Sequence, residues 1–319
     1  MFTFDCETHL FGPMDDISYF PNFRKYMESI RTLSKARGLA GRSEESLSQT
    51  TDADWLIKSM DSVGIDMACV LPEAMLNLSH GHRVRSTNGW VAKEIAKYPE
   101  RLIGVCNVGP IITRGVENAV WELEYLVKEV GFKGCKLYPP EDAPINDRRL
   151  WPFYEKVREL RVPLFVHTGT SYVMPGHSQY CHPILLEDVI VDFPEIPIIA
   201  YHMGYPHYHE LNILAAMHPN LYISTSLLHL FTFGAPRACQ KLIGEAIAWV
   251  GIDRLIWGTD WSGTLGTHKE QVEFLKNFQI SEAVQQDYGF KPLSEEDRQK
   301  WAGLNLARIL GIEPRKFTK

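Results

Sequence analysis

The sequence predicts an α/β protein that folds as a (β/α)₈ barrel, and three observations carry this prediction. Short apolar runs rich in β-branched residues alternate with longer segments of helical periodicity. Eight such runs can be distinguished, and four of them end in a side chain that can bind a metal ion. A length of 319 residues fits one barrel domain over residues 1–319, although length alone would also allow two domains. A doubly wound open sheet would show the same alternation, but the strand count and the positions of the metal-binding side chains favour the barrel.

The eight apolar runs are mostly continuous rather than alternating, which is typical of parallel strands covered on both faces. We expect strands at 3–7, 67–72, 102–108, 134–138, 163–167, 196–202, 221–225 and 254–258.

The helices follow from apolar spacing and from capping residues. Asp52 can cap a helix over 53–63 that Gly64 ends, and a second helix over 116–130 ends at Gly131. Further helices are expected at 88–97, 151–160, 183–192, 209–217, 238–250 and 269–278.

Two segments fall outside the repeat. Residues 10–50 are far longer than an ordinary connection, and we expect a lid insertion there, with a helix near 22–36. A final helix over 295–310, ended by Gly311, is expected to pack on the outside of the barrel.

Composition narrows the class of partner. The formal net charge is -6, from 33 basic and 39 acidic residues, which gives no reason to expect nucleic acid or an anionic membrane as a partner. The N-terminus lacks the basic and apolar regions of a signal peptide, and no apolar run approaches the length of a membrane span. The six cysteines are scattered and mostly lie in apolar runs, as in a cytoplasmic protein with reduced thiols.

Metal-binding side chains stand at the ends of four expected strands. Glu7 and His9 close the first, His167 the fifth, His202 the sixth and Asp260 follows the eighth. In a barrel, all strand C-termini lie at one face, so residues far apart in sequence can converge there. Glu7 and His9 are two apart and therefore point to the same side of their strand. Imidazole and carboxylate ligands together suit Zn²⁺, with Mn²⁺ or Fe²⁺ as alternatives.

With these residues in place, the sequence resembles the amidohydrolase superfamily, and within it the subgroup of aminocarboxymuconate-semialdehyde and γ-resorcylate decarboxylases. The resemblance covers nearly the whole chain, with 10–50 covered least. It implies one divalent metal ion on Glu7, His9, His167 and Asp260, with His202 as catalytic acid/base. In a hydrolase that used the same site, Asp260 and His202 would pass protons. The E-x-H version of the first-strand motif is associated with non-oxidative decarboxylases. The resemblance therefore implies a metal-dependent decarboxylase of a small unsaturated or aromatic carboxylate.

Two residues qualify that expectation. Relatives of the γ-resorcylate type tend to carry an acid after His-Met-Gly, where Tyr205 stands here, and this argues against a salicylate-like substrate. Lys136 occupies about the position of the carboxylated lysine that bridges two metal ions in binuclear amidohydrolases. Because Glu7 already replaces a histidine of the binuclear set, we favour a single metal ion.

The substrate would be a small carboxylate bound by basic residues near the mouth of the barrel. Candidates are Lys136, Arg83, Arg85 and Arg237, with Tyr205 beside them. Arg237 resembles a residue that reaches a neighbouring subunit's site, so we expect a homodimer or a higher homo-oligomer. Two alternatives stay open. The same site could serve a hydrolase of a lactone, ester, amide or carbon–carbon bond, and the fold could hold a metal ion for structure only, although closed structural zinc sites usually use cysteine.

Overall fold

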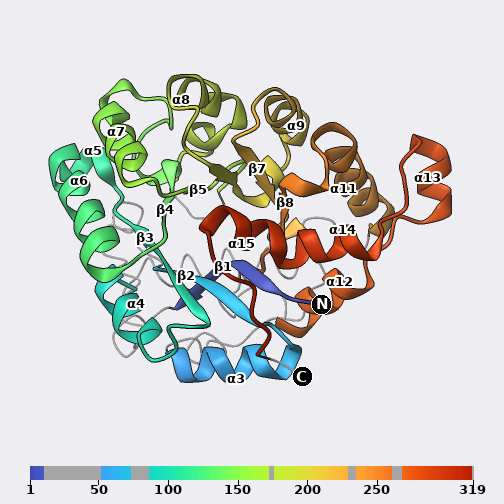
Figure 1. The fold of residues 1–319 in the computed structure, drawn as a ribbon. Helices are drawn as coiled ribbons and strands as arrows, with labels where there is room; N and C mark the ends of the chain where they lie inside the picture. The colour runs from blue at the N-terminus through green and yellow to red at the C-terminus, as the bar shows by residue number, and fades with distance from the viewer. Residues whose placement is uncertain (11–51, 73–85, 172–175, 229–234, 261–267, 318–319) are drawn as a thin grey trace, which may run out of the picture.

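The computed structural model describes residues 1–10, 52–72, 86–171, 176–228, 235–260 and 268–317. The expected lid at 10–50 therefore lies outside the described residues except at its first position. Parallel strands form one sheet in the order β1 to β8, and helices surround it (Figure 1). This confirms the (β/α)₈ barrel. The strands are β1 (Phe4–Leu10), β2 (Met67–Pro72), β3 (Leu102–Asn107), β4 (Gly134–Leu137), β5 (Leu164–Val166), β6 (Ile198–Ala200), β7 (Leu221–Ser224) and β8 (Leu255–Ile256).

The helices begin and end close to the expected positions, because their caps can be recognised in the sequence. The Asp52 side chain accepts a hydrogen bond from Trp55 N at the start of α3 (Ala53–Val63), and Gly64 ends this helix with a φ of 85°. The other helices on the barrel wall are α4 (Asn88–Ile95), α5 (Ile111–Arg114), α6 (Val116–Tyr125) with its continuation η2 (Leu126–Val130), α7 (Trp151–Leu160), α8 (Leu186–Asp192), α9 (Tyr208–Met217), α11 (Pro236–Val250) and α12 (His268–Asn277).

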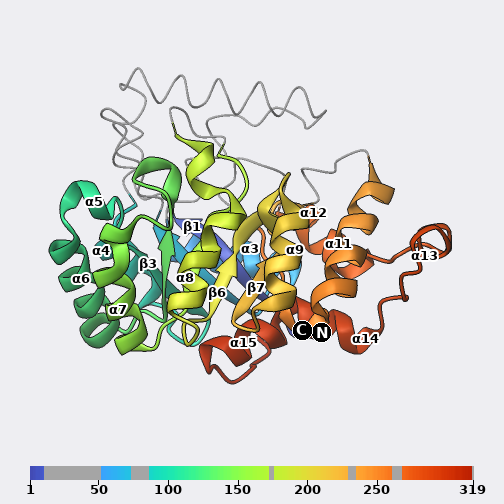
Figure 2. The same cartoon turned by 90° about the horizontal axis from the view of Figure 1, so that it is seen from above.

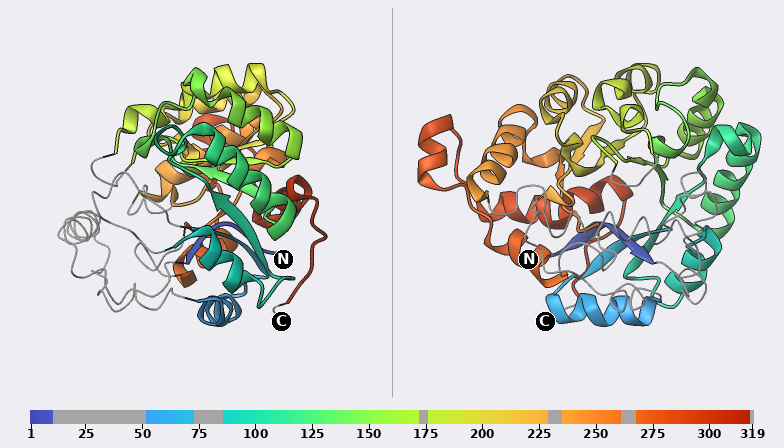
Figure 3. Two further views of the ribbon diagram at one scale, coloured as in Figure 1. Left: turned by 90° about the vertical axis from the view of Figure 1, so that its left-hand side faces the viewer. Right: turned by 180° about the vertical axis from the view of Figure 1, so that it is seen from behind.

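Three further helices follow the eighth repeat: α13 (Glu282–Tyr288), α14 (Glu295–Gln299) and α15 (Asn305–Leu310), the last two joined by η9 (Lys300–Leu304). Figure 3 shows α13 standing out from the wall of the barrel. The sequence-based expectation did not include α13. In Figure 2 both chain termini lie at the end of the barrel where α14 and α15 sit.

Two apolar layers hold the barrel together. Alternate strand residues fill its interior, where Phe4, Cys69, Phe165 and Ile256 belong to one buried cluster. The intervening residues face outward and pack against the helices in a larger cluster. The strands are covered on both sides, which explains why their sequences are continuously apolar.

The C-terminal segment was expected to pack on the outside of the barrel, but it also contacts the strands β1 and β8. The strands pair in sequence from β1 to β8, and η9 contacts both β8 and β1 at the seam between them. The carbonyl of Trp301 accepts a hydrogen bond from Trp257 N, next to β8. A Cβ on Gly303 would lie 2.8 Å from Phe4 N in β1, so a side chain could not fit there without movement. Leu306 is part of the interior cluster, so the last helix also covers the N-terminal end of the barrel.

No helix among the described residues combines the length and the apolar character that a membrane span requires.

Candidate metal centre

A bulge in β1 sets the direction of the first two site residues. Asp5 pairs with Ala68 of β2, whereas Thr8 pairs with Val70, so β1 carries one extra residue between these points. The side chain of Cys6 fills the barrel interior, and Glu7 points into the mouth instead of outward. Strict alternation would have forced one of the two to face the helices.

Asp5 holds this bulge in place. Its carboxylate accepts hydrogen bonds from Glu7 N at 3.0 Å and Thr8 Oγ1 at 2.9 Å, and from Thr259 N at 2.9 Å across the β8–β1 seam. Burial raises the pKa of Asp5 to about 6, while these hydrogen bonds oppose the rise. Asp5 therefore orients the strand and the loop that carries Asp260.

Glu7 is fully buried and lies at the centre of the cluster. Its Oε1 is 2.9 Å from Lys136 Nζ on β4, and its Oε2 accepts a hydrogen bond from Ser226 Oγ at 2.7 Å. His202 Nδ1 lies 3.9 Å from the same Oε2. The carboxylate is thus fixed from three sides in a site that water scarcely reaches.

His9 and Asp260 complete one face of the site. His9 Nε2 lies 3.1 Å from Asp260 Oδ1 and 4.0 Å from Glu7 Oε1. One donor atom from each of the three residues lies within 4.8 Å of the other two, which is the spacing of side chains around a shared metal ion. Asp260 has a φ of 49°, a conformation that is uncommon for residues other than glycine, and burial raises its pKa.

His167 and His202 form the opposite face. His202 Nε2 lies 3.1 Å from His167 Nδ1, and the ring centroids are 4.8 Å apart. His167 Nε2 is 3.1 Å from the carbonyl oxygen of Thr170, which can only accept, so this nitrogen carries the ring proton. In the neutral ring the lone pair of His167 is then on Nδ1, the nitrogen that faces into the site.

The hydrogen-bond partners of His202 likewise determine which of its ring nitrogens carries the proton. Its Nδ1 lies 3.1 Å from Ser226 Oγ, whose single proton goes to Glu7, and 3.4 Å from the Ser226 carbonyl oxygen. Nδ1 is therefore the donor, and Nε2 presents a lone pair toward His167. Burial lowers the pKa of His202 to about 4 and that of His167 well below its usual range, so both rings are neutral near pH 7. His167 Nδ1 can therefore offer its lone pair to a metal ion, and His202 Nε2, 3.1 Å away, can take up a proton.

The loops behind β5 and β6 hold these histidines by close backbone contact. Gly169 has a φ of 94°, and a Cβ there would lie 2.2 Å from the Tyr205 carbonyl oxygen. His202 and Met203 have positive φ angles of 61° and 51° in the turn that follows β6. Such conformations persist only where the surrounding structure imposes them, and they are frequent at functional sites.

The structure brings Glu7, His9, His167, His202 and Asp260 together, with Lys136 against Glu7. The other residues expected at the substrate are placed differently. Tyr205 is half-buried behind the β6 turn, and Arg237 is exposed at the start of α11. Arg83 and Arg85 lie outside the described residues. Ser226, which contacts both Glu7 and His202, was missed, because a serine after a strand carries no chemical signature in a single sequence.

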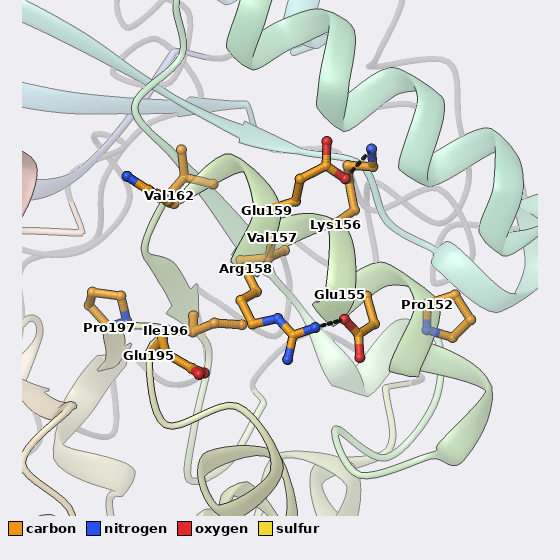
Figure 4. Close-up of a pocket in the computed structure, with 11 residues that line it drawn as sticks. Pro152, Glu155, Lys156, Val157, Arg158, Glu159, Val162, Glu195, Ile196 and Pro197 are labelled. Carbon is orange, nitrogen blue, oxygen red and sulfur yellow. Dashed lines mark hydrogen bonds and ion pairs between the residues drawn. The ribbon is translucent and has the colours of Figure 1, made fainter.

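A surface pocket lies at the opposite end of the barrel (Figure 4). It is bordered by α7 and by the residues that enter β5 and β6, including Val162 and Ile196, whereas the site lies where these strands end. Its ion pairs, Lys156 with Glu159 and Arg158 with Glu155, are neighbours on one helix. Such pairs are ordinary on an exposed helix, so this pocket is not the candidate site.

Comparison with known proteins defines the class of protein. The family model for amidohydrolases matches residues 5–312, so the chain belongs to the amidohydrolase family. This agrees with the resemblance to the decarboxylase-containing subgroup seen in the sequence.

Two curated relatives differ in the reaction they carry out. The chain is 28% identical over 185 residues to a 2-keto-4-carboxy-3-hexenedioate hydratase of Sphingobium sp., an alignment that covers 51% of this chain and 54% of the hydratase. It thus spans only about half the length of that relative. Over 249 residues it is 27% identical to a γ-resorcylate decarboxylase of Polaromonas sp., covering 65% of this chain and 73% of the decarboxylase.

Solved structures share the fold at lower identity. A TIM-barrel protein of Bordetella bronchiseptica superposes with a TM-score of 0.74 at 18% identity, covering 98% of this chain and 99% of that one. A dihydroxybenzoic acid decarboxylase of Polaromonas sp. with bound manganese and an inhibitor gives 0.61 at 20% identity, with 97% of each chain covered. A probable 2-pyrone-4,6-dicarboxylic acid hydrolase of Acinetobacter baumannii with bound citric acid gives 0.63 at 17% identity, covering 98% and 100%.

Proposed function

We propose that this protein is a metal-dependent, non-oxidative decarboxylase of a small unsaturated or aromatic carboxylate. The observation that carries the proposal is the convergence of Glu7, His9 and Asp260 on one point, beside the facing pair His167 and His202. The decarboxylase among the curated relatives supports this choice of reaction. The family match over 5–312 supports a single domain over the whole chain.

The residues present fit one divalent ion held by Glu7, His9, His167 and Asp260. Two carboxylates and two imidazoles suit Zn²⁺, Mn²⁺ or Fe²⁺. Zn²⁺ was the first expectation from the sequence, and the manganese bound by the Polaromonas decarboxylase makes Mn²⁺ an equal candidate. A single ion fits the replacement by Glu7 of a histidine of the binuclear set, and Lys136 Nζ, 2.9 Å from Glu7 Oε1, would then act as a cation beside the site.

A bound ion would act as a Lewis acid that fixes the substrate and stabilises the negative charge that develops on it. The protein's own groups then handle one proton. The bond from carbon to the carboxylate breaks, CO₂ leaves, and the carbon takes a proton in its place. His202 Nε2 faces the site and can pass this proton from water to the carbon. Ser226 and Glu7 hold the ring of His202 in position, and Lys136 supplies a fixed positive charge beside them.

Addition of water is the second candidate, since one curated relative is a hydratase and Tyr205 stands where an acid is usual in decarboxylases of the γ-resorcylate type. Hydrolysis is a further candidate that the same donor set allows, and one structural relative is a probable hydrolase. All three reactions would act on a small carboxylate at this site. They differ in whether CO₂ leaves and whether oxygen from water enters the product.

The proposed setting is the cytoplasm, as a homodimer or higher homo-oligomer with a small carboxylate as its partner. The six cysteines are all free and buried, which suits a reducing compartment. Arg237 is exposed at the start of α11 and could reach the site of a neighbouring copy.

A panel of conjugated mono-, di- and tricarboxylates, assayed for CO₂ release with protein reconstituted in Mn²⁺ or Zn²⁺, tests the proposal. We expect release by the wild type that chelation abolishes. His167→Ala should lose the metal ion together with activity, whereas His202→Ala should keep the ion and lose turnover by about two to four orders of magnitude. Equal loss of metal from both variants would contradict the role given to His202. Turnover without CO₂ release would contradict the decarboxylase.

A further inference from the structure

A second group of metal-binding side chains lies outside the site described above. His182, His207 and Glu210 each offer one ligand atom, and these atoms lie within 4.8 Å of one another. The rings of the two histidines are 4.1 Å apart between centroids. His182 precedes η6 (Pro183–Leu185), His207 immediately precedes α9, and Glu210 is in the first turn of that helix. None of the three contributes to the Glu7 cluster.

The backbone fixes the distance between the two loops that carry these residues. A Cβ on Gly204 would lie 2.7 Å from Pro183 Cγ, so the turn after β6 rests directly on the start of η6. Gly169 makes a similar close approach to Tyr205. Tight packing on both sides means that His182 and His207 are held near each other without an ion, and little order has to be created when one binds.

We propose that His182, His207 and Glu210 form a second divalent-cation site, selective for a transition metal such as Zn²⁺, at the rim of the barrel. Two imidazoles and one carboxylate are ligands that Zn²⁺ accepts, whereas Mg²⁺ and Ca²⁺ prefer sites made of oxygen ligands. His182 and His207 are half-buried and Glu210 is exposed, so water can fill the remaining coordination positions.

The backbone of η6 fixes the orientation of the His182 ring. His182 Nδ1 accepts a hydrogen bond from Ile184 N at 3.3 Å, which is long for such a bond. An ion on Nδ1 would displace Ile184 N, and an ion on Nε2 would leave the ring proton on Nδ1, so this hydrogen bond is lost in either case. Because the bond is long, its loss costs little stability.

Two features make this site weaker than the proposed catalytic one. It has three protein ligands and open access to water, and it stands at the positive end of the α9 dipole, which disfavours a cation. The carboxylate of Glu210 offsets that effect in part. We therefore expect the rim site to fill only after the Glu7 cluster is occupied, as a brace between the loops that follow β5 and β6.

The test is a Zn²⁺ titration of tag-free, metal-loaded protein by calorimetry, with bound metal counted by elemental analysis. The wild type should take up one equivalent of Zn²⁺ more than His207→Ala or His182→Ala, and Glu210→Gln should bind that equivalent about tenfold more weakly or worse. His209→Ala and His177→Ala are matched controls, because both histidines are exposed and lie close by in sequence. They should bind like the wild type. Circular dichroism confirms that each variant is folded.

No additional equivalent in the wild type, or one that survives His207→Ala, would overturn the proposal, as would its loss from the His209→Ala control. The inference does not rest on the proposed function. His9→Ala tests the Glu7 cluster alone. If this variant keeps the strongly bound ion, the proposed catalytic site is wrong, but the expected difference in Zn²⁺ uptake between the wild type and His207→Ala is unchanged.

Discussion

The ammonium group of Lys136 lies 2.9 Å from the carboxylate of Glu7, and both side chains are buried in the mouth of the barrel. This pair joins β1 to β4 across the interior. A charge placed so deep needs its partner, because neither group can turn to bulk water if the other is removed.

Lys136→Met should therefore lower the free energy of unfolding of the metal-free protein by about 3–5 kcal/mol, since it leaves Glu7 buried without this cation. Lys269→Met is the control: Lys269 Nζ pairs with Glu273 at 3.6 Å, and the two side chains are 73% and 55% exposed. Its loss should cost about 1 kcal/mol or less. Urea unfolding of both variants measures the difference, and equal costs would contradict the importance assigned to the buried pair.

Ser226→Ala should reduce kcat by about 10–100-fold at saturating metal, with a smaller change in KM. The reason is that Ser226 Oγ contacts both Glu7 Oε2 and His202 Nδ1 and so fixes the orientation of the imidazole. Ser226→Thr keeps the hydroxyl and should recover part of the activity. If Thr and Ala variants behave alike in steady-state kinetics, the hydroxyl does not position His202.

Gly169→Ala should destabilise the protein by about 2–4 kcal/mol, because the new Cβ would lie 2.2 Å from the Tyr205 carbonyl oxygen. Gly131→Ala isolates the backbone cost: its φ is 89°, close to the 94° of Gly169, but no atom lies within 4 Å of the added Cβ. That variant should lose about 1–2 kcal/mol. Thermal unfolding of the pair gives the cost of the collision, and equal shifts would show that the two loops can separate freely.

His268, which is not part of the Glu7 cluster, gives the protein a pH-dependent stability. Burial lowers its pKa to about 3, while its Nδ1 lies 2.9 Å from Ser59 Oγ on α3. As the pH falls from 6.5 toward 3, the unfolded chain binds a proton that the native ring does not, so stability is lost by up to about 1.4 kcal/mol per pH unit.

His268→Gln should flatten this part of the stability curve, whereas His209→Gln, at an exposed position, should leave it unchanged. Chemical unfolding between pH 6.5 and 4 measures both slopes. Parallel curves for His268→Gln and the wild type would show that another group causes the acid sensitivity.

The barrel and much of the site could be predicted because their signals are local. Asp52, Gly64 and Gly131 mark helix ends through local capping interactions, which do not depend on tertiary contacts. The convergence of Glu7, His9, His167, His202 and Asp260 follows from the rule that strand C-termini share one face.

The remaining features depend on contacts that no local pattern encodes. The bulge in β1 exists because Asp5 binds Thr259 across the seam, 254 residues away. The seam itself is covered by η9, whose fit depends on the absence of a side chain at Gly303 beside Phe4. Ser226 is important only through its two neighbours. The short helix α13 follows Ser281, whose side chain makes no capping hydrogen bond, so no capping motif in the sequence marks the start of this helix.

Turnover in D₂O, followed by NMR and mass spectrometry of the product, separates loss of CO₂ at a metal site served by His202 from the addition of water. We expect one carboxylate to leave as CO₂ and one deuterium to take its place on the same carbon. A product that keeps every carboxylate and gains oxygen from the solvent would contradict it and identify the enzyme as a hydratase or a hydrolase.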